Sequence, residues 1–219
     1  MVTVSGRGVR AGRSEETREL ILAAAERLFA ENGVATVSNR QVSEAAGQGN
    51  NFAVGYHFGT KTELVRAIVR KHADHTERLR LRMLAESGDI DDLRGWVACL
   101  VRPPIEHLAA LGSPTWYARF GAQIMTDPAL RSIMVDEALT SAAMQRIVVG
   151  INRCRPALPD EVRLERSEMA RHLIVHTCAE RERSLAEGAP TPRSSWDDTA
   201  TGLIDAIVGL WLAPVTSVG

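Results

Sequence analysis

The sequence has few cysteines and no long hydrophobic run, and each shortage excludes a class of protein. Only three cysteines occur among 219 residues, and their number is odd and their spacing unpaired. We therefore expect neither a disulfide framework nor a Cys-x-x-Cys zinc site. The longest apolar run, residues 203–213, is interrupted by Asp205 and is too short to span a bilayer. The amino-terminal residues lack an apolar signal core. We expect a cytoplasmic protein that is neither secreted nor inserted in a membrane.

Signatures of catalysis and of metal binding are also missing. No Gly-rich phosphate loop, Gly-x-Ser-x-Gly elbow or convincing acid/base pair occurs, so we expect neither an enzyme nor a cofactor. His172 and His176 have the i, i+4 spacing that presents two imidazoles to one side of a helix. Cys178 points elsewhere and no clear third ligand follows, so no metal site is predicted.

Charge is unevenly divided along a chain whose net charge is -1 and whose hydrophobic content of 45% is enough for a core. Residues 1–72 carry ten basic and seven acidic side chains, whereas residues 73–219 carry sixteen arginines and twenty acidic side chains. A modestly positive end on an acidic chain would concentrate attraction for a polyanion at that end.

Helical periodicity runs through nearly the whole chain, so we predict an all-α fold. Residues 14–32 place apolar side chains on one stripe, with Ser14 as the N-cap and Gly33 as a left-handed stop. Ser38 and Gln41 have capping-box spacing and open a short helix that ends at Gly47.

A third short helical segment, Phe52–Phe58, follows a polar turn. The pattern Thr60-Lys61-Thr62-Glu63 then opens a long helix to about Glu86. A long helix, a short helix, a glycine-containing turn and a second short helix are the parts of a helix-turn-helix DNA-binding unit. The turn asparagines suit base edges, while Tyr56, His57 and Lys61 suit phosphate oxygens. Turn chemistry without any DNA contact is the competing interpretation.

Three blocks in the first seventy residues resemble the tetracycline-repressor (TetR) family of bacterial transcription regulators. They are Ile21–Gly33, Ser38–Gly47 and Tyr56–Leu64. The resemblance implies an N-terminal helix-turn-helix DNA-binding domain and a C-terminal helical domain that binds a ligand and dimerises. It also implies DNA contacts from the residues Ser38, Arg40, Tyr56, His57 and Lys61.

The turn departs from the usual Gly-Val-Ser of that family and holds one extra residue before the His-Phe pair. It reads Gly47-Gln48-Gly49-Asn50-Asn51. Gln48, Asn50, Asn51 and Phe52 are our candidates for the major groove. For Asn50 a simple N-cap, and for Phe52 a core position, remain alternatives.

An amino-terminal segment, residues 1–13, precedes the first predicted helix. Arg7, Arg10 and Arg13 alternate there with glycine and small residues, which predicts a flexible basic arm able to follow a phosphate backbone or enter a minor groove. A tail with incidental charge is the alternative. The DNA-binding domain is then predicted at residues 14–72 and the effector-binding and dimerisation domain at residues 87–219.

Proline and glycine punctuation divides the carboxy-terminal region into helices. They are predicted at residues 91–101, 104–110, 114–126, 128–153, 160–186 and 195–213. The final helix has an apolar surface wider than one stripe requires, which predicts a dimer interface shared with the preceding helix. The predicted interface residues are His172, His176, Leu203, Ile204, Ile207, Val208 and Trp211. Burial within one chain is the alternative.

Large or adaptable side chains in this region could line an effector cavity. The candidates are Trp96, His107, Trp116, Tyr117, Arg119, Phe120, Met125, Met144 and Met169. The densest cluster, residues 116–120, predicts a largely apolar or aromatic effector, with Arg119 or His107 as a polar contact.

The favoured hypothesis is a homodimeric repressor that binds a palindromic operator in double-stranded DNA and is released by a small molecule. The second hypothesis is a helical adaptor whose DNA motif is vestigial, and the third is an enzyme in the carboxy-terminal region. The sequence identifies neither the effector nor the operator.

Overall fold

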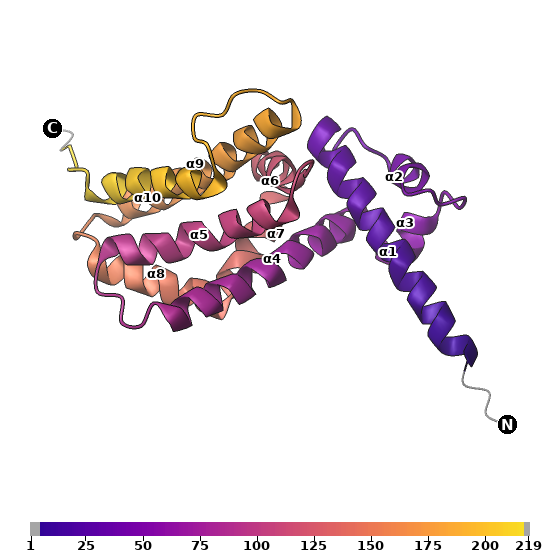
Figure 1. The fold of residues 1–219 in the computed structure, drawn as a ribbon, viewed down its shortest axis with the longest axis horizontal. Helices are drawn as coiled ribbons and strands as arrows, with labels where there is room; N and C mark the ends of the chain where they lie inside the picture. The colour runs from indigo at the N-terminus through magenta and orange to yellow at the C-terminus, as the bar shows by residue number, and fades with distance from the viewer. Residues whose placement is uncertain (1–4, 217–219) are drawn as a thin grey trace.

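The chain folds into helices joined by short loops (Figure 1). The computed structural model describes the backbone of residues 5–216 and the side chains of residues 12–216. Ten helices and no strand occur in these ranges. The helices are α1 (Ser5–Asn32), α2 (Asn39–Ala45), α3 (Ala53–Phe58), α4 (Lys61–Glu86), α5 (Leu93–Leu111), α6 (Tyr117–Thr126), α7 (Arg131–Thr140), α8 (Ala142–Cys154), α9 (Asp160–Ala186) and α10 (Trp196–Leu212). The predicted all-α fold is confirmed.

The first helix begins earlier than the sequence predicts. The predicted N-cap, Ser14, lies inside α1, which starts at Ser5. No proline interrupts residues 5–13, and the arginine and alanine residues there favour helix enough to extend it through the intervening glycines. The N-cap assignment of Ser14 is therefore wrong, and Arg13 is an exposed residue of α1.

Two other predicted boundaries differ from the structure. The sequence predicts a break at Pro103-Pro104, yet α5 runs through both prolines. Burial of Val101, Ile105 and Leu108 in the core holds the helix together where the missing amide donors weaken it. The predicted helix at residues 128–153 is instead divided into α7 and α8.

The ends of α4 and α8 show how caps fix the long elements. Thr60 accepts a hydrogen bond from the Glu63 amide at 3.1 Å and starts α4 as predicted. Ser141 accepts from the Met144 amide at 3.0 Å and starts α8. Each cap satisfies one amide that the first turn of a helix would otherwise leave unpaired.

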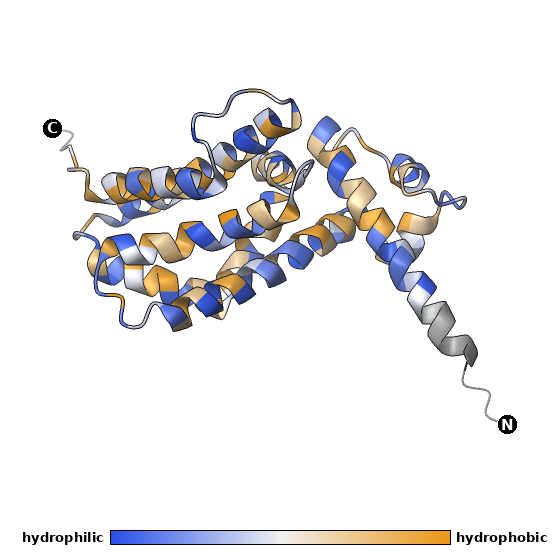
Figure 2. Ribbon diagram, viewed as in Figure 1, coloured by the Kyte–Doolittle hydropathy of each residue, from blue (hydrophilic) through white to orange (hydrophobic). Residues whose placement is uncertain are grey.

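Helices α1–α3 lie at one end of the molecule, and α4 runs from that end along the body formed by α5–α10 (Figure 1). In the body α10 packs on α5, α5 on α4 and α8, and α6 on α9. Hydrophilic and hydrophobic residues alternate along each helix (Figure 2), as expected where one stripe faces a core. No helix within residues 5–216 combines the length and apolar character needed to cross a membrane.

Helix α6 connects the two parts of the molecule. Its residues Phe120 and Ile124 are fully buried in the same hydrophobic cluster as Phe29 of α1 and Leu64 of α4. The Phe29 and Phe120 rings stack with centroids 6.3 Å apart. The amino-terminal helices therefore share their core with the body rather than folding around a separate one.

Candidate functional site

The first helix of the helix-turn-helix is held by the predicted capping box. The Ser38 hydroxyl accepts from the Gln41 amide at 3.2 Å, and the Ser38 amide donates to Gln41 Oε1 at 2.8 Å. Within α2, Val42 is buried on the inner face, while Arg40 is exposed and pairs with Glu44 at 2.7 Å. The hydrogen bond and the charge of Glu44 raise the pKa of Arg40. Arg40 thus keeps its charge at the surface beside the turn.

The polar turn is fixed by local hydrogen bonds. Gly47 has a φ of +67°, a left-handed conformation that glycine adopts without the strain of a side chain. Gln48 is half-buried, and its side-chain amide donates to the Ala46 carbonyl at 3.0 Å. Asn50 Oδ1 accepts from the Phe52 amide at 2.9 Å, while its remaining surface is exposed, as is that of Asn51. The N-cap alternative for Asn50 is therefore wrong, because the N-cap of α3 is Phe52 and the Asn50 side chain closes a turn before the helix instead.

Helix α3 displays aromatic side chains to solvent. Phe52 is 80% exposed and Tyr56 is 83% exposed, whereas Val54 and Phe58 are buried on the opposite side. The core alternative for Phe52 is thus wrong. Single exposed hydrophobic side chains are common, but two large aromatic side chains exposed within five residues mark a candidate interaction site.

Helix α1 contacts α3 on the side opposite the exposed aromatic residues and holds α3 in place. Arg18 on α1 donates to the His57 carbonyl at 3.1 Å and lies 4.3 Å from the centroid of the Phe58 ring. His57 is half-buried beside Tyr56, with the two rings edge-to-face at 5.0 Å. We call Arg40, Asn50, Asn51, Phe52 and Tyr56 the recognition surface.

Lys61 and Arg13 are not part of this surface. Lys61 is half-buried, and its ammonium donates to the Val34 carbonyl at 3.0 Å, so its nitrogen is partly committed within the protein. Arg13 is exposed on α1. The side chains of Arg7 and Arg10 lie outside the described residues.

A chain of buried polar groups connects α1 to the body, and we call Glu26, His72 and His107 the buried histidine chain. His72 Nε2 lies 2.8 Å from Glu26 Oε2, and His72 Nδ1 lies 2.7 Å from His107 Nε2. The Tyr117 ring stacks on His72 at 3.7 Å. These contacts join α1, α4, α5 and α6 at one point.

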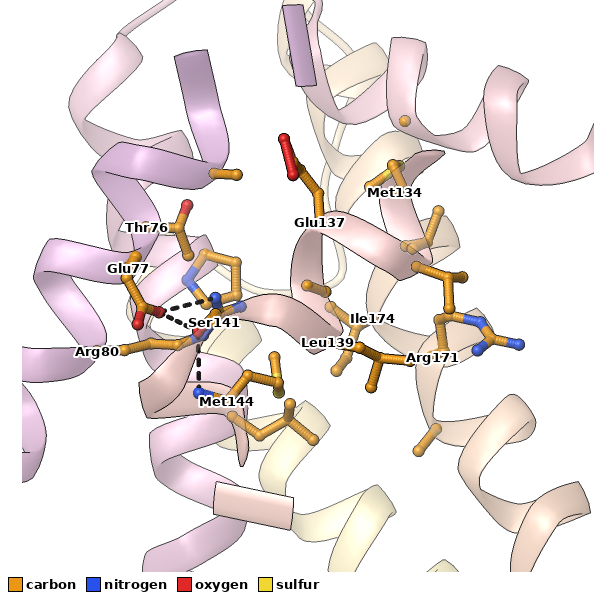
Figure 3. Close-up of a pocket in the computed structure, with 18 of the residues that line it drawn as sticks. Thr76, Glu77, Arg80, Met134, Glu137, Leu139, Ser141, Met144, Arg171 and Ile174 are labelled. Atoms are coloured by element: carbon orange, nitrogen blue, oxygen red, sulfur yellow. Dashed lines mark hydrogen bonds and ion pairs between the residues drawn. The ribbon is translucent and has the colours of Figure 1, made fainter. Parts of the chain in front are cut away.

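A cavity of about 590 Å³ opens beside this chain, between α4, α7, α8 and α9. Figure 3 shows Thr76, Glu77 and Arg80 on one wall and Arg171 and Ile174 on another. Most of its lining is apolar, as in sites that bind small molecules. The cavity thus lies along the same helix that begins at the helix-turn-helix.

Only part of the predicted ligand set lines this cavity. Tyr117, Met125 and Met144 do. The other six residues, Trp96, His107, Trp116, Arg119, Phe120 and Met169, lie elsewhere.

For five of these six residues, contacts elsewhere in the protein explain their place. A Cβ on Gly150 would come within 2.1 Å of Trp96, so this ring fills the groove that Gly150 leaves on α8. Arg119 instead pairs with Glu182, which is 1% exposed, at 3.1 Å. Met169 is 42% exposed on α9. Trp116 and Phe120 pack on the amino-terminal core, and His107 belongs to the buried histidine chain.

Sequence reasoning missed three residues on the inner stripe of α4. His72, Thr76 and Arg80 are each less than 10% exposed and continue, at spacings of four, the apolar stripe that includes Ile68 and ends at Leu84. Polar residues on an otherwise apolar stripe are the signal that would have identified them.

The predicted dimer residues of α10 need correction. Leu203, Ile204, Ile207 and Trp211 are between 0% and 4% exposed, because α10 packs on α5 and α9 of its own chain. They are core residues and are not on a surface that a partner could meet. Val208 is half-buried, while His172 and His176 are exposed on α9 with ring centroids 6.0 Å apart.

Comparison with known families and structures assigns the fold. Residues 21–68 match the family described as bacterial regulatory proteins, tetR family, and residues 98–209 match the tetracyclin repressor-like C-terminal domain. The second match alone covers more than half of the chain. Comparison with curated proteins finds no similar sequence.

Several solved structures share the fold. NalD, the secondary repressor of the MexAB-OprM multidrug efflux pump in Pseudomonas aeruginosa, is 22% identical with a TM-score of 0.57, over 91% of this chain and 98% of NalD. Mycobacterium smegmatis AmtR is 20% identical with a TM-score of 0.56, over 87% of this chain and 85% of AmtR. The multidrug binding protein EbrR, solved with imidazole, is 21% identical with a TM-score of 0.51, over 91% of this chain and 97% of EbrR.

The two family matches cover both the helix-turn-helix and the helical body that the structure shows. The chain belongs to the TetR family of transcriptional regulators.

Proposed function

We propose that this protein is a homodimeric repressor that binds a palindromic operator through its recognition surface and is released by a small molecule in the α4–α9 cavity. The observation that carries the proposal is the exposure of Phe52 and Tyr56 next to two exposed asparagines at the tip of the helix-turn-helix. Such a surface offers hydrogen-bonding groups for base edges and aromatic groups for sugar and phosphate contacts. Because the target is chromosomal DNA, we expect the protein to act in the cytoplasm.

Release would act through α4. This helix carries the cavity residues Thr76, Glu77 and Arg80 and, one to two turns earlier, His72 of the buried histidine chain. A ligand that binds better when α4 is tilted would move α1–α3 relative to the body and so weaken operator binding. Only a difference in ligand affinity between the two conformations can drive this change.

The proposed dimer would place two recognition surfaces about 34 Å apart, one turn of DNA, so that both enter successive major grooves. The exposed faces of α9 and α10 are the candidate interface, since Met169, Leu173 and Leu212 are apolar and between 38% and 55% exposed. His172 and His176 lie on the same exposed side of α9.

A gel shift with DNA from beside the protein's own coding region tests the operator proposal directly. We expect specific retardation that survives excess nonspecific DNA and weakens with salt. Tyr56→Ala should lower the specific affinity at least about tenfold, the loss of one good contact to DNA. It should change the free energy of unfolding by less than about 0.5 kcal/mol because the side chain is exposed.

The matched control is Val149→Ala, a comparably exposed apolar residue on α8, far along the chain from the recognition surface. It should leave operator affinity unchanged. Equal affinities of Tyr56→Ala and the unaltered protein would remove Tyr56 from the proposed surface. No specific retardation even in low salt would instead favour an adaptor with a vestigial DNA motif.

The interface is tested by placing a charge on α9. Leu173→Asp should convert a dimer at micromolar concentration into a monomer in equilibrium sedimentation, since a buried unpaired carboxylate is strongly unfavourable. Leu81→Asp, at a comparably exposed position on α4, serves as the control and should stay dimeric. A monomeric unaltered protein would refute the dimer, and a dimeric Leu173→Asp would move the interface to another face.

A further inference from the structure

The lining of the cavity includes hydrogen-bond donors without acceptors. Among the described residues, the buried nitrogens Arg80 Nε, Arg171 Nε and Trp211 Nε1 have no hydrogen-bond partner, and all three residues line the cavity. Buried donors are normally paired, because leaving one unpaired costs the loss of its hydration. A cavity whose unpaired buried groups are donors favours a ligand that supplies acceptors.

Arg80 is the strongest of these donors. It is only 9% exposed, on the inner stripe of α4, and its Nε has no hydrogen-bond partner among the described residues. Its Nη1 forms a long ion pair with Glu77 Oε2 at 3.9 Å, which is too far for a hydrogen bond. Burial lowers the pKa of Arg80, while Glu77 and Tyr117 raise it, but an arginine stays protonated in proteins.

Glu77 does not offset this charge fully, because it is bound to the start of α8. Its carboxylate accepts from the Ala143 amide at 3.0 Å. It also accepts from the Ser141 hydroxyl (Figure 3). A carboxylate at a helix amino terminus also interacts favourably with the helix dipole. Glu77 therefore holds α8 in place, and Arg80 is left as a buried cation facing the cavity.

Tyr117 lines the same cavity as Arg80 and adds a second polar group to it. Burial, followed by the charge of Glu26, raises the pKa of Tyr117, while the positive charge of Arg80 lowers it. Beyond these two residues the lining turns apolar, with Met144, Leu139 and Ile174 among the side chains (Figure 3). The cavity is thus polar around Arg80 and mostly apolar elsewhere, with Arg171 on the opposite wall.

We propose that the effector is an amphipathic carboxylic acid whose carboxylate binds between the Arg80 guanidinium and the Tyr117 hydroxyl and whose apolar body fills the space toward α7 and α9. Charge-assisted bonds from arginine to a carboxylate are short and strong. The bound carboxylate would lie next to the Tyr117 ring, which stacks on His72. His72 in turn is hydrogen-bonded to Glu26 of α1. This inference rests on the proposed function, because it names the chemical class for the same cavity.

The test compares three ligands that share one apolar chain and differ in the head: decanoate, decan-1-ol and decylamine. Calorimetric titration of the full chain at pH 7.5, below the concentration at which the ligands self-associate, should show decanoate binding at least about tenfold more tightly than decanol. Decylamine should bind most weakly, since its cation faces Arg80. Equal affinities for decanoate and decanol, or no binding of decanoate, would overturn the proposal.

Substitutions on α4 test whether the carboxylate of decanoate binds at Arg80. Arg80→Met should lower decanoate affinity at least about tenfold and leave decanol affinity within about twofold, because the apolar volume is nearly kept. Arg78→Met, on the same helix but outside the cavity lining, is the matched control and should change neither. If Arg80→Met does not fold, Arg80→Gln replaces it, since a glutamine removes the positive charge but can still donate a hydrogen bond. An unchanged decanoate preference in the variant that folds refutes the role of Arg80.

The same preparations separate this inference from the function on which it rests. Specific operator retardation that decanoate does not release overturns the acid effector and leaves the regulator standing. Decanoate binding through Arg80 without specific retardation of any flanking DNA keeps the site and refutes the operator proposal.

Discussion

Replacing Phe120 with alanine is expected to lower the free energy of unfolding by about 3–5 kcal/mol, the usual cost of removing a buried phenyl ring. The side chain is fully buried and stacks on Phe29 across the contact between α6 and α1. Its loss removes apolar burial and leaves a cavity that rigid neighbouring helices cannot fill. Since domains are stable by about 5–15 kcal/mol, this is a large fraction of the total.

Urea unfolding followed by circular dichroism measures this change. Phe120→Leu keeps most of the apolar volume and should lose clearly less stability, while Val149→Ala at the exposed surface of α8 should lose less than about 0.5 kcal/mol. A loss below about 1 kcal/mol for Phe120→Ala would mean that α6 and α1 do not share the core that the structure shows.

Helix α6 matters for stability and for coupling because three side chains close together in its sequence contact three different parts of the protein. Tyr117 lines the cavity and stacks on His72, Arg119 pairs with Glu182 of α9, and Phe120 enters the amino-terminal core. Glu182 also accepts from the Ala118 amide at 3.0 Å, which fixes the start of α6 against α9. A ligand that displaces α6 would therefore act on α1 and α4 together.

The sequence predicts the elements whose determinants are local. The Ser38–Gln41 box and the Thr60 cap are each decided by residues three apart, so α2 and α4 begin where the pattern places them. The exposure of Tyr56 also follows, because Val54 and Phe58, four residues apart, form the buried face of α3 and Tyr56 lies on the opposite face.

The features that sequence reasoning missed depend on distant residues. The break between α7 and α8 is stabilised by Glu77, which is 64 residues from Ser141, and the setting of α6 depends on Glu182, 63 residues from Arg119. No pattern in a window of one helix contains such a pair.

The wide apolar surface of α10 shows a different limit. Its residues Leu203, Ile204, Ile207 and Trp211 are apolar on more than one side because α10 meets two helices of its own chain, α5 and α9. Width alone cannot distinguish a second internal neighbour from a partner subunit. The burial of each side chain decides between them.

Acidification is expected to destabilise the protein through His107. Burial, followed by the charges of His72, His75 and Arg78, lowers the pKa of His107 to about 4. The Glu26 carboxylate can only accept, so His72 donates to it from Nε2 and has no proton on Nδ1. His72 Nδ1 therefore accepts from His107 Nε2, and the other nitrogen of His107, Nδ1, carries no proton. That nitrogen is buried and unpaired, so protonating it would bury a donor without an acceptor.

The sign follows from the two pKa values. His107 titrates near 6.5 in the unfolded chain and near 4 in the fold, so below pH 6.5 the unfolded chain binds more protons and stability is lost as pH falls toward 4. Between pH 7.5 and pH 5 this one residue should lower the free energy of unfolding by about 2 kcal/mol.

Urea unfolding at the two pH values measures the loss. His107→Gln can still donate to His72 but does not titrate, and it should reduce the difference between the two pH values by about the same amount. An identical pH dependence in the variant and the unaltered protein would show that the destabilisation comes from other groups, because every other histidine and carboxylate is retained in His107→Gln.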